Sequence, residues 1–159
     1  MPASTKAQDV GLEVDLLGSS AKSPEQLMAG IVKLLHQTML TYNWVGFYML
    51  EKSEPVLALG PFEGATTPHR RIPLSQGICG AAASTGQTVV VDDVHSDRRY
   101  LACSIETQSE IVVPVFVRGK VVGELDIDSR FPAAFTAADR ELVEHCARVV
   151  GKYLESAGS

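Results

Sequence analysis

Apolar residues recur along this chain with two different periods, and each period predicts one class of secondary structure. Helical spacing, with apolar side chains three to four positions apart, runs from Leu27 to Thr38 and predicts a helix with one buried face. Ser23 before Pro24 favours the start of that helix, as its N-cap and its first-turn residue. A closing helix is predicted from the capping residue Thr136 to about residue 154.

Shorter segments rich in β-branched and aromatic residues lie between these helices and predict strands. The predicted strands cover residues 44–50, 56–59, 70–74, 88–91, 111–117 and 120–128. Arg118-Gly119 joins the last two and predicts a β-hairpin, whereas residues 60–64 read as a break after the second strand. Residues 77–85, rich in Ala and Gly, predict a tightly packed helix. This order favours an α+β domain with a central, mostly antiparallel sheet flanked by helices.

Length and patterning favour a single domain. The chain has 159 residues, enough to bury a substantial core, and we expect one catalytic domain over residues 23–156. Residues 1–22 read as an N-terminal arm that is mobile or loosely docked. Apolar runs are too short to cross a bilayer, and the first ten residues do not resemble a secretory signal. The chain is therefore expected to be cytoplasmic, without membrane contact.

The net charge and the cysteines of the chain argue against several classes of function. A net charge of −5 argues against a nucleic-acid partner. The three cysteines of a cytoplasmic chain are expected to be reduced thiols. No Cys-x-x-Cys pair occurs and the histidines are scattered, so the sequence predicts neither a metal site nor an organic cofactor.

Two cysteines and three carboxylates fall on neighbouring predicted elements. Cys103 lies just before the strand that follows Glu110, and Cys79 lies in the small-residue helix. Asp126 and Asp128 alternate with aliphatic residues, so they share one face of a strand. Clustered carboxylates raise at least one pKa, which keeps one acid neutral. A thiol beside such a cluster indicates a cysteine nucleophile served by a proton donor.

Each of these residues also has a structural interpretation. Free cysteines are most often packing residues, and Cys146, on the apolar face of the closing helix, is expected to be one of them. Cys79 between two glycines could simply be a small residue at a tight helix start. The pair Asp126 and Asp128 would by default face solvent, and Trp44 alone would be a core residue.

Seven short strings combine these residues in one order. They are Asn43-Trp-Val-Gly-Phe-Tyr48, Leu59-Gly-Pro-Phe62, Gly77-Ile-Cys-Gly80, Asp93-Val-His95, Leu101-Ala-Cys103, Ser109-Glu-Ile-Val-Val-Pro114 and Gly123-Glu-Leu-Asp-Ile-Asp-Ser129. Together they resemble the GAF-domain free methionine-(R)-sulfoxide reductases over roughly residues 24–154. The resemblance implies a GAF-like fold, a homodimer, and reduction of free L-methionine (R)-sulfoxide to methionine. It also implies an external thiol reductant such as thioredoxin and no other cofactor.

The resemblance assigns roles to the cysteines. Cys103 corresponds to the nucleophile that becomes a sulfenic acid, and Cys79 to one of two partner cysteines that then form a disulfide. Many members carry a further resolving cysteine ten residues before the cysteine that corresponds to Cys79. In this chain His69 lies at that place. Recycling must then use Cys79 or an external thiol.

The remaining roles concern the substrate pocket. Glu110 and Asp128 correspond to acids around the sulfoxide, and Asp126 to one that binds the substrate's amino group. Trp44 corresponds to an aromatic residue that lines the pocket for the substrate methyl group, with Tyr48 nearby. Two other functions stay open: a GAF module that binds a small ligand without chemistry, and a thiol switch that senses redox state.

Overall fold

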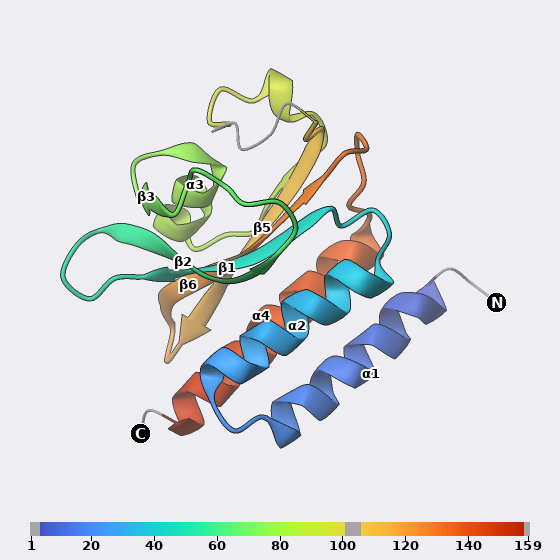
Figure 1. Ribbon diagram of the computed structural model, residues 1–159. Coiled ribbons are helices and arrows are strands. Elements are labelled where there is room, and N and C mark those ends of the chain that lie inside the picture. The colour runs from blue at the N-terminus through green and yellow to red at the C-terminus, as the bar shows by residue number, and fades with distance from the viewer. Residues whose placement is uncertain (1–3, 101–105, 158–159) are drawn as a thin grey trace.

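An antiparallel sheet forms the centre of the computed structural model, which describes residues 4–100 and 106–157 (Figure 1). Within those residues six strands pair in the spatial order β3-β2-β1-β6-β5-β4. Their bounds are β1 Trp44–Leu50, β2 Val56–Glu63, β3 Arg71–Pro73, β4 Val89–Val91, β5 Ser109–Val117 and β6 Lys120–Ser129. All pairings are antiparallel. The predicted α+β architecture, with a central antiparallel sheet flanked by helices, is confirmed.

Helices cover the two faces of the sheet unequally. Figure 1 shows the helices α1, α2 and α4 together on one face and the short helix α3 on the other. Their bounds are α1 Ser4–Ser20, α2 Pro24–Thr38, α3 Gly77–Thr85 and α4 Ala137–Ala157, with a 3-10 turn at Val94–Ser96. The described helices include none that is both long and apolar enough to cross a bilayer.

The strand β6 divides its side chains between two separate cores. Leu125 and Ile127 are fully buried in the core beneath α1, α2 and α4. Because side chains alternate along a strand, Asp126 and Asp128 point to the other face. A smaller apolar cluster on that face surrounds α3 and includes Tyr48 and Cys79. The acids therefore lie at the interface between the sheet and the α3 side.

Local signals explain the helix starts and the hairpin. Ser23 accepts a hydrogen bond from the Gln26 amide at 3.1 Å, as its N-cap position predicts. Thr136 and Asp139 cap the start of α4 reciprocally. Arg118 and Gly119 both have positive φ, 50° and 79°, which suits a two-residue hairpin.

The predicted break at residues 60–64 is wrong, because β2 continues to Glu63. The register with β1 shifts between Gly46 and Tyr48, and Gly60 and Pro61 lie opposite this shift. A shift of this kind leaves a residue without a ladder partner, so the missing N–H of Pro61 is tolerated there. The strand then pairs again, with Phe62 opposite Gly46.

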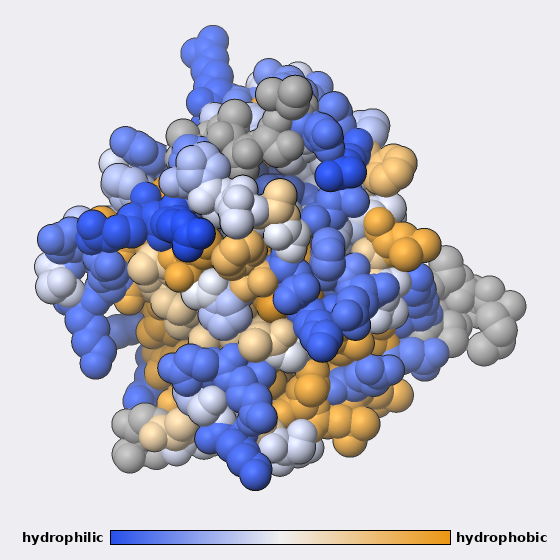
Figure 2. All heavy atoms as spheres, in the orientation of Figure 1, coloured by the Kyte–Doolittle hydropathy of each residue, from blue (hydrophilic) through white to orange (hydrophobic). Residues whose placement is uncertain are grey.

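The prediction of a mobile or loosely docked arm is also wrong for Ser4–Ser20, which form α1. Val10 and Val14 are 2% and 0% exposed and belong to the larger core. Apolar residues at positions 7, 10, 14 and 17 form a helical stripe, which was the available signal. Hydrophobic residues also reach the surface over α1 (Figure 2), where Leu12 and Leu16 are exposed.

Truncation of Val14 should therefore destabilise the protein. We expect Val14→Ala to lower the free energy of unfolding by about 2 kcal/mol, because it leaves a cavity under α1. The control is Leu16→Ala, which removes a larger side chain that is 67% exposed and should cost less than about 0.5 kcal/mol. Urea denaturation measures both values. Equal, small effects would mean that α1 is docked loosely.

Candidate functional site

Four carboxylates, termed the acid cluster, share the sheet face that α3 covers: Glu110, Glu124, Asp126 and Asp128. Three of them alternate along β6, and Glu110 lies on β5 directly opposite Asp128. Paired residues on adjacent strands point to the same side, so the strand pairing itself assembles the cluster. All four are buried, with exposures of 6%, 0%, 2% and 4% in the order named.

Cys79 reaches the acid cluster from the opposite side of this interface. It lies in the first turn of α3 and is 5% exposed. Its thiol donates a hydrogen bond to Oδ2 of Asp126, with 3.4 Å between sulfur and oxygen. The helix can lie this close because residue 80 is glycine: a Cβ there would come within 2.7 Å of the Leu74 carbonyl oxygen.

Burial shifts the acids of the cluster toward their neutral form. Burial raises the pKa of Glu110 well above its usual range, and the charges of Asp126 and Asp128 raise it further. The pKa of Asp128 is also raised well above its usual range, first by burial and then by Asp126. Among the described residues, no Lys, Arg or His forms an ion pair with the cluster. Such acids can hold protons near neutral pH and donate them.

The same surroundings keep Cys79 protonated. Burial raises the pKa of its thiol well above the usual value, and the charges of Asp126, Glu124 and Glu110 add to the shift. A thiol of this kind is a poor nucleophile until it loses its proton. Asp126, which accepts its hydrogen bond, is positioned to take that proton.

Two aromatic residues of β1 face the same side as the acid cluster. Trp44 lies opposite Asp128 and Tyr48 opposite Glu124. The Trp44 ring stacks on Phe62 at a centroid distance of 5.8 Å, and its Nε1 donates to the Ala65 carbonyl at 3.0 Å. Tyr48 is buried, and its hydroxyl donates to the backbone carbonyl of His69 at 2.7 Å.

Gly46, between these two aromatic residues, leaves room for the indole. A Cβ on Gly46 would collide with the outer edge of the Trp44 ring. The ring can therefore lie back across β1 while its indole N–H remains bonded to Ala65. Trp44 is thus held in one orientation beside Asp128.

A small cavity of about 60 Å³ marks where the acid cluster approaches the surface. Asp128 is the member of the cluster that lines it, together with Asn43, Trp44, Ala65, Thr66, Thr67, Thr107 and Arg130. Aromatic, hydroxyl and carboxyl groups thus converge on one point. Asp128 is nearest to this opening, and Glu124 lies deepest, four residue pairs further along the sheet.

The structure describes two of the three cysteines, and their surroundings differ. Cys103 lies outside the described residues, so its role as nucleophile stays a prediction. Cys146 is fully buried in the core on the opposite face of the sheet, as its helical position predicted. Burial raises the pKa of its thiol to about 12, which makes it unreactive. Cys79 is the described cysteine that contacts the acid cluster.

Glu124 and Thr107 are site residues that the sequence interpretation missed. Glu124 continues the alternation of Asp126 and Asp128 by one step, and that period was its available signal. Thr107 is 4% exposed and lines the small cavity, yet no local pattern distinguishes it from other polar loop residues.

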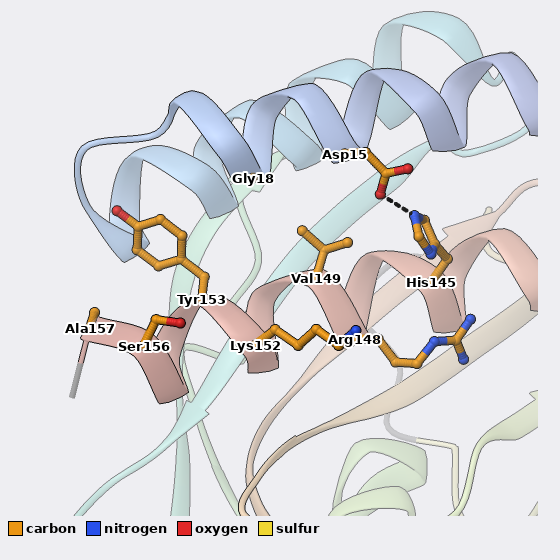
Figure 3. Close-up of a pocket in the computed structure, with 9 residues that line it drawn as sticks. All are labelled: Asp15, Gly18, His145, Arg148, Val149, Lys152, Tyr153, Ser156 and Ala157. Atoms are coloured by element: carbon orange, nitrogen blue, oxygen red, sulfur yellow. Dashed lines mark hydrogen bonds and ion pairs between the residues drawn. The ribbon is translucent and has the colours of Figure 1, made fainter. Parts of the chain in front are cut away.

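A larger hollow of about 620 Å³ lies between α1 and α4 (Figure 3). The figure shows Asp15 and His145 facing each other across it, joined by a 2.7 Å contact, with Arg148 and Lys152 extending from α4. The residues that line it include no thiol and no group of acids. The chemistry therefore favours the acid cluster as the functional site, although its cavity is smaller.

Comparison with known proteins identifies relatives over most of the chain. Residues 23–154 match the GAF domain family. The chain is 35% identical over 146 residues to the free methionine-R-sulfoxide reductase of Escherichia coli (strain K12), covering 89% of this chain and 87% of that protein. It is 42% identical over 112 residues to the free methionine-R-sulfoxide reductase of Saccharomyces cerevisiae, covering 69% of this chain and 62% of that protein.

A solved structure agrees with this result. The X-ray structure of free methionine-R-sulfoxide reductase from Neisseria meningitidis, in complex with its substrate, has a TM-score of 0.93 to this chain. The two are 31% identical, and the match covers 99% of this chain and 93% of that one. Sequence and fold thus point to the same group of proteins.

Proposed function

The chain belongs to the free methionine-(R)-sulfoxide reductases, a group of GAF-domain oxidoreductases, and on that premise we propose a thiol mechanism in which Cys103 attacks the substrate. The substrate is free L-methionine (R)-sulfoxide and the product is methionine. One observation carries the proposal: a buried thiol, Cys79, is hydrogen-bonded to a buried acid cluster whose pKa values are raised.

In the first step, the Cys103 thiolate attacks the sulfoxide sulfur while the sulfoxide oxygen accepts a proton. Glu110 and Asp128 support this step, because burial and mutual repulsion favour their neutral, proton-donating forms. The hydroxyl group then moves from the substrate sulfur to the Cys103 sulfur, as the sulfur–oxygen bond of the substrate and the new sulfur–sulfur bond both break. This releases methionine and leaves Cys103 as a sulfenic acid. The two electrons that reduce the substrate come from the Cys103 sulfur.

In the second step, the Cys79 sulfur attacks the sulfenic acid of Cys103 and water leaves. Asp126 takes the thiol proton along the 3.4 Å hydrogen bond as the sulfur–sulfur bond forms, so the attack does not require a free Cys79 thiolate beforehand. The product is a Cys79–Cys103 disulfide. An external dithiol such as thioredoxin then reduces it by thiol–disulfide exchange. Summed over both steps, one sulfoxide and two thiols give methionine, one disulfide and one water.

Substrate binding uses the rest of the site. Asp126 carries the charge that can pair with the α-ammonium group of the amino acid. Trp44, whose ring is held by Phe62 and the Ala65 carbonyl, provides an apolar surface for the S-methyl group. Tyr48 supports the loop at His69 through its 2.7 Å hydrogen bond.

A direct assay tests the proposed function. Each epimer of free methionine sulfoxide is supplied with dithiothreitol or thioredoxin, and methionine release is measured. Release from the (R)-epimer of the free amino acid, and not from the (S)-epimer, is the expected result. A protein that binds the (R)-epimer without releasing methionine would be a sensing module and not a reductase.

Cys79→Ser separates chemistry from recycling. We expect this variant to release about one methionine per chain in a single turnover, because Cys103 still performs the first step, and then to stop when thioredoxin is the reductant. Wild-type protein oxidised by substrate should yield a Cys79–Cys103 peptide in mass spectrometry, with Cys146 free. Normal cycling of Cys79→Ser with thioredoxin would show that Cys103 is reduced directly.

We also propose a homodimer in the cytoplasm. Exposed apolar side chains on the outer face of α1, among them Leu12 and Leu16, offer a surface for a second copy. The recycling step consumes reduced thiols, which the cytoplasm supplies. Sedimentation of the purified protein tests the oligomeric state.

A further inference from the structure

Cys79 and two members of the acid cluster, Glu110 and Asp126, lie close together in the fold although they are far apart in the sequence. One possible ligand atom from each of Cys79, Glu110 and Asp126 lies within 4.8 Å of the other two. The sulfur of Cys79 and Oδ2 of Asp126 are 3.4 Å apart. Ligand atoms on a tetrahedral zinc ion lie about 3.3–3.5 Å apart, given Zn–S and Zn–O bonds of about 2.3 and 2.0 Å. Small side-chain rotations would close the remaining difference.

A second observation, which does not depend on this spacing, is that the acid cluster contains buried oxygens without hydrogen-bond partners among the described residues. Both carboxylate oxygens of Glu124, and Oδ1 of Asp126 and of Asp128, have no hydrogen-bond partner among the described residues. These three side chains are at most 4% exposed. A buried ionised carboxylate is costly unless a proton or a cation compensates it. No described basic side chain pairs with the cluster, so the positive charge must come from protons or from a ligand.

The kind of donor selects the kind of ion. Mg²⁺ and Ca²⁺ prefer coordination shells made only of oxygen ligands, so a site that contains a thiolate does not suit them. Zn²⁺ accepts sulfur and carboxylate oxygen together in a four-coordinate site. Cys79, Glu110 and Asp126 supply three such donors. Glu124 shares the face of β6 that carries Asp126, and neither of its carboxylate oxygens has a hydrogen-bond partner among the described residues, so it offers a fourth donor.

We propose that Zn²⁺ binds to Cys79, Glu110 and Asp126 and thereby inhibits the protein reversibly. The ion binds the thiolate of Cys79 and displaces its proton, so binding should strengthen as pH rises. A metal-bound Cys79 cannot form a disulfide, and metal-bound carboxylates cannot donate protons or pair with an ammonium group. Free zinc would thus inhibit both the reduction of the sulfoxide and the formation of the Cys79–Cys103 disulfide. Zinc binding at this site rests on the geometry alone and does not require the proposed function.

Cobalt(II), a spectroscopic substitute for zinc, tests the site directly. Reduced full-length protein is titrated with Co²⁺, and we expect about one ion per chain with a thiolate-to-cobalt absorption band, which Zn²⁺ then displaces. Cys79→Ser should lose the band, and Asp126→Asn should weaken binding by at least about tenfold. Cys146→Ser is the matched control, since it removes a buried thiol on the opposite face of the sheet. It should keep both the band and the affinity.

The possible outcomes are distinct. A band that survives in Cys79→Ser, or no thiolate band in wild type, would overturn the zinc site. Circular dichroism confirms the fold of each variant, and if Asp126→Asn does not fold, the Cys79→Ser result decides alone. Because absorption is read without turnover, a protein that binds cobalt as expected but reduces no methionine sulfoxide would retain the zinc site and reject the proposed function. Zinc inhibition of methionine release, relieved by a chelator, is the corresponding expected result in the activity assay.

Discussion

Cys103→Ser is expected to abolish the reduction of free methionine (R)-sulfoxide. The physical reason is that the other two thiols are poorly suited to attack the substrate. Burial raises the pKa of Cys146 to about 12, and the pKa of Cys79 is raised by burial and by the charges of the acid cluster. A serine hydroxyl cannot replace a thiolate as a nucleophile toward sulfur. Methionine release should therefore fall below about a hundredth of the wild-type rate.

Cys146→Ser provides the control for this variant. Its side chain lies in the core on the far face of the sheet from the acid cluster, so turnover should stay within about twofold of wild type. Methionine release with dithiothreitol measures both variants and bypasses any defect in thioredoxin recycling. Residual activity of Cys103→Ser above a hundredth would assign the nucleophile to another residue.

Local sequence signals predicted much of the fold because the responsible interactions are local. The hairpin follows from the positive φ angles that Arg118 and Gly119 adopt in a two-residue turn. The helix starts follow from capping side chains such as Ser23, which bonds to an amide three residues away. The shared face of Asp126 and Asp128 follows from strand alternation alone. In each case the partners are adjacent or nearly adjacent in the chain.

The features that sequence reasoning missed depend on long-range packing. The hydrogen bond of Cys79 to Asp126 joins residues 47 positions apart, and the docking of α3 on the sheet creates it. Burial of Glu124 has the same origin, since an alternating acid on a strand usually faces water. The helix α1 was missed because apolar residues such as Leu12 and Leu16 also occupy its exposed face, which blurs the stripe that it buries. Its helical state is stabilised by contacts of Val10 and Val14 with the core.

Replacement of the pocket acids by amides should have the second large effect. We expect Glu110→Gln and Asp128→Asn each to slow the reductive step by about 10²–10⁴-fold, the usual contribution of a general acid. Both changes keep the shape of the side chain but remove the proton that the sulfoxide oxygen requires. Rapid-mixing measurement of methionine formation in a single turnover isolates this step from recycling. Glu124→Gln is the matched comparison, because it removes an equally buried carboxyl that lies four residue pairs along the sheet from Asp128, whereas Glu110 lies directly opposite Asp128. It should lower the rate far less.

The pH dependence distinguishes proton donation from a structural role of the same residues. A neutral acid donates the proton, and the pKa values of Glu110 and Asp128 are raised by burial and by their negatively charged neighbours. The wild-type rate of the reductive step should therefore decline as pH rises through those raised pKa values, where the donors lose their protons. The double variant Glu110→Gln/Asp128→Asn has no such group to titrate, so its residual rate should show no alkaline decline. An unchanged decline in the double variant, or single-turnover rates equal to wild type in both single variants, would show that these carboxyls only support the structure of the pocket.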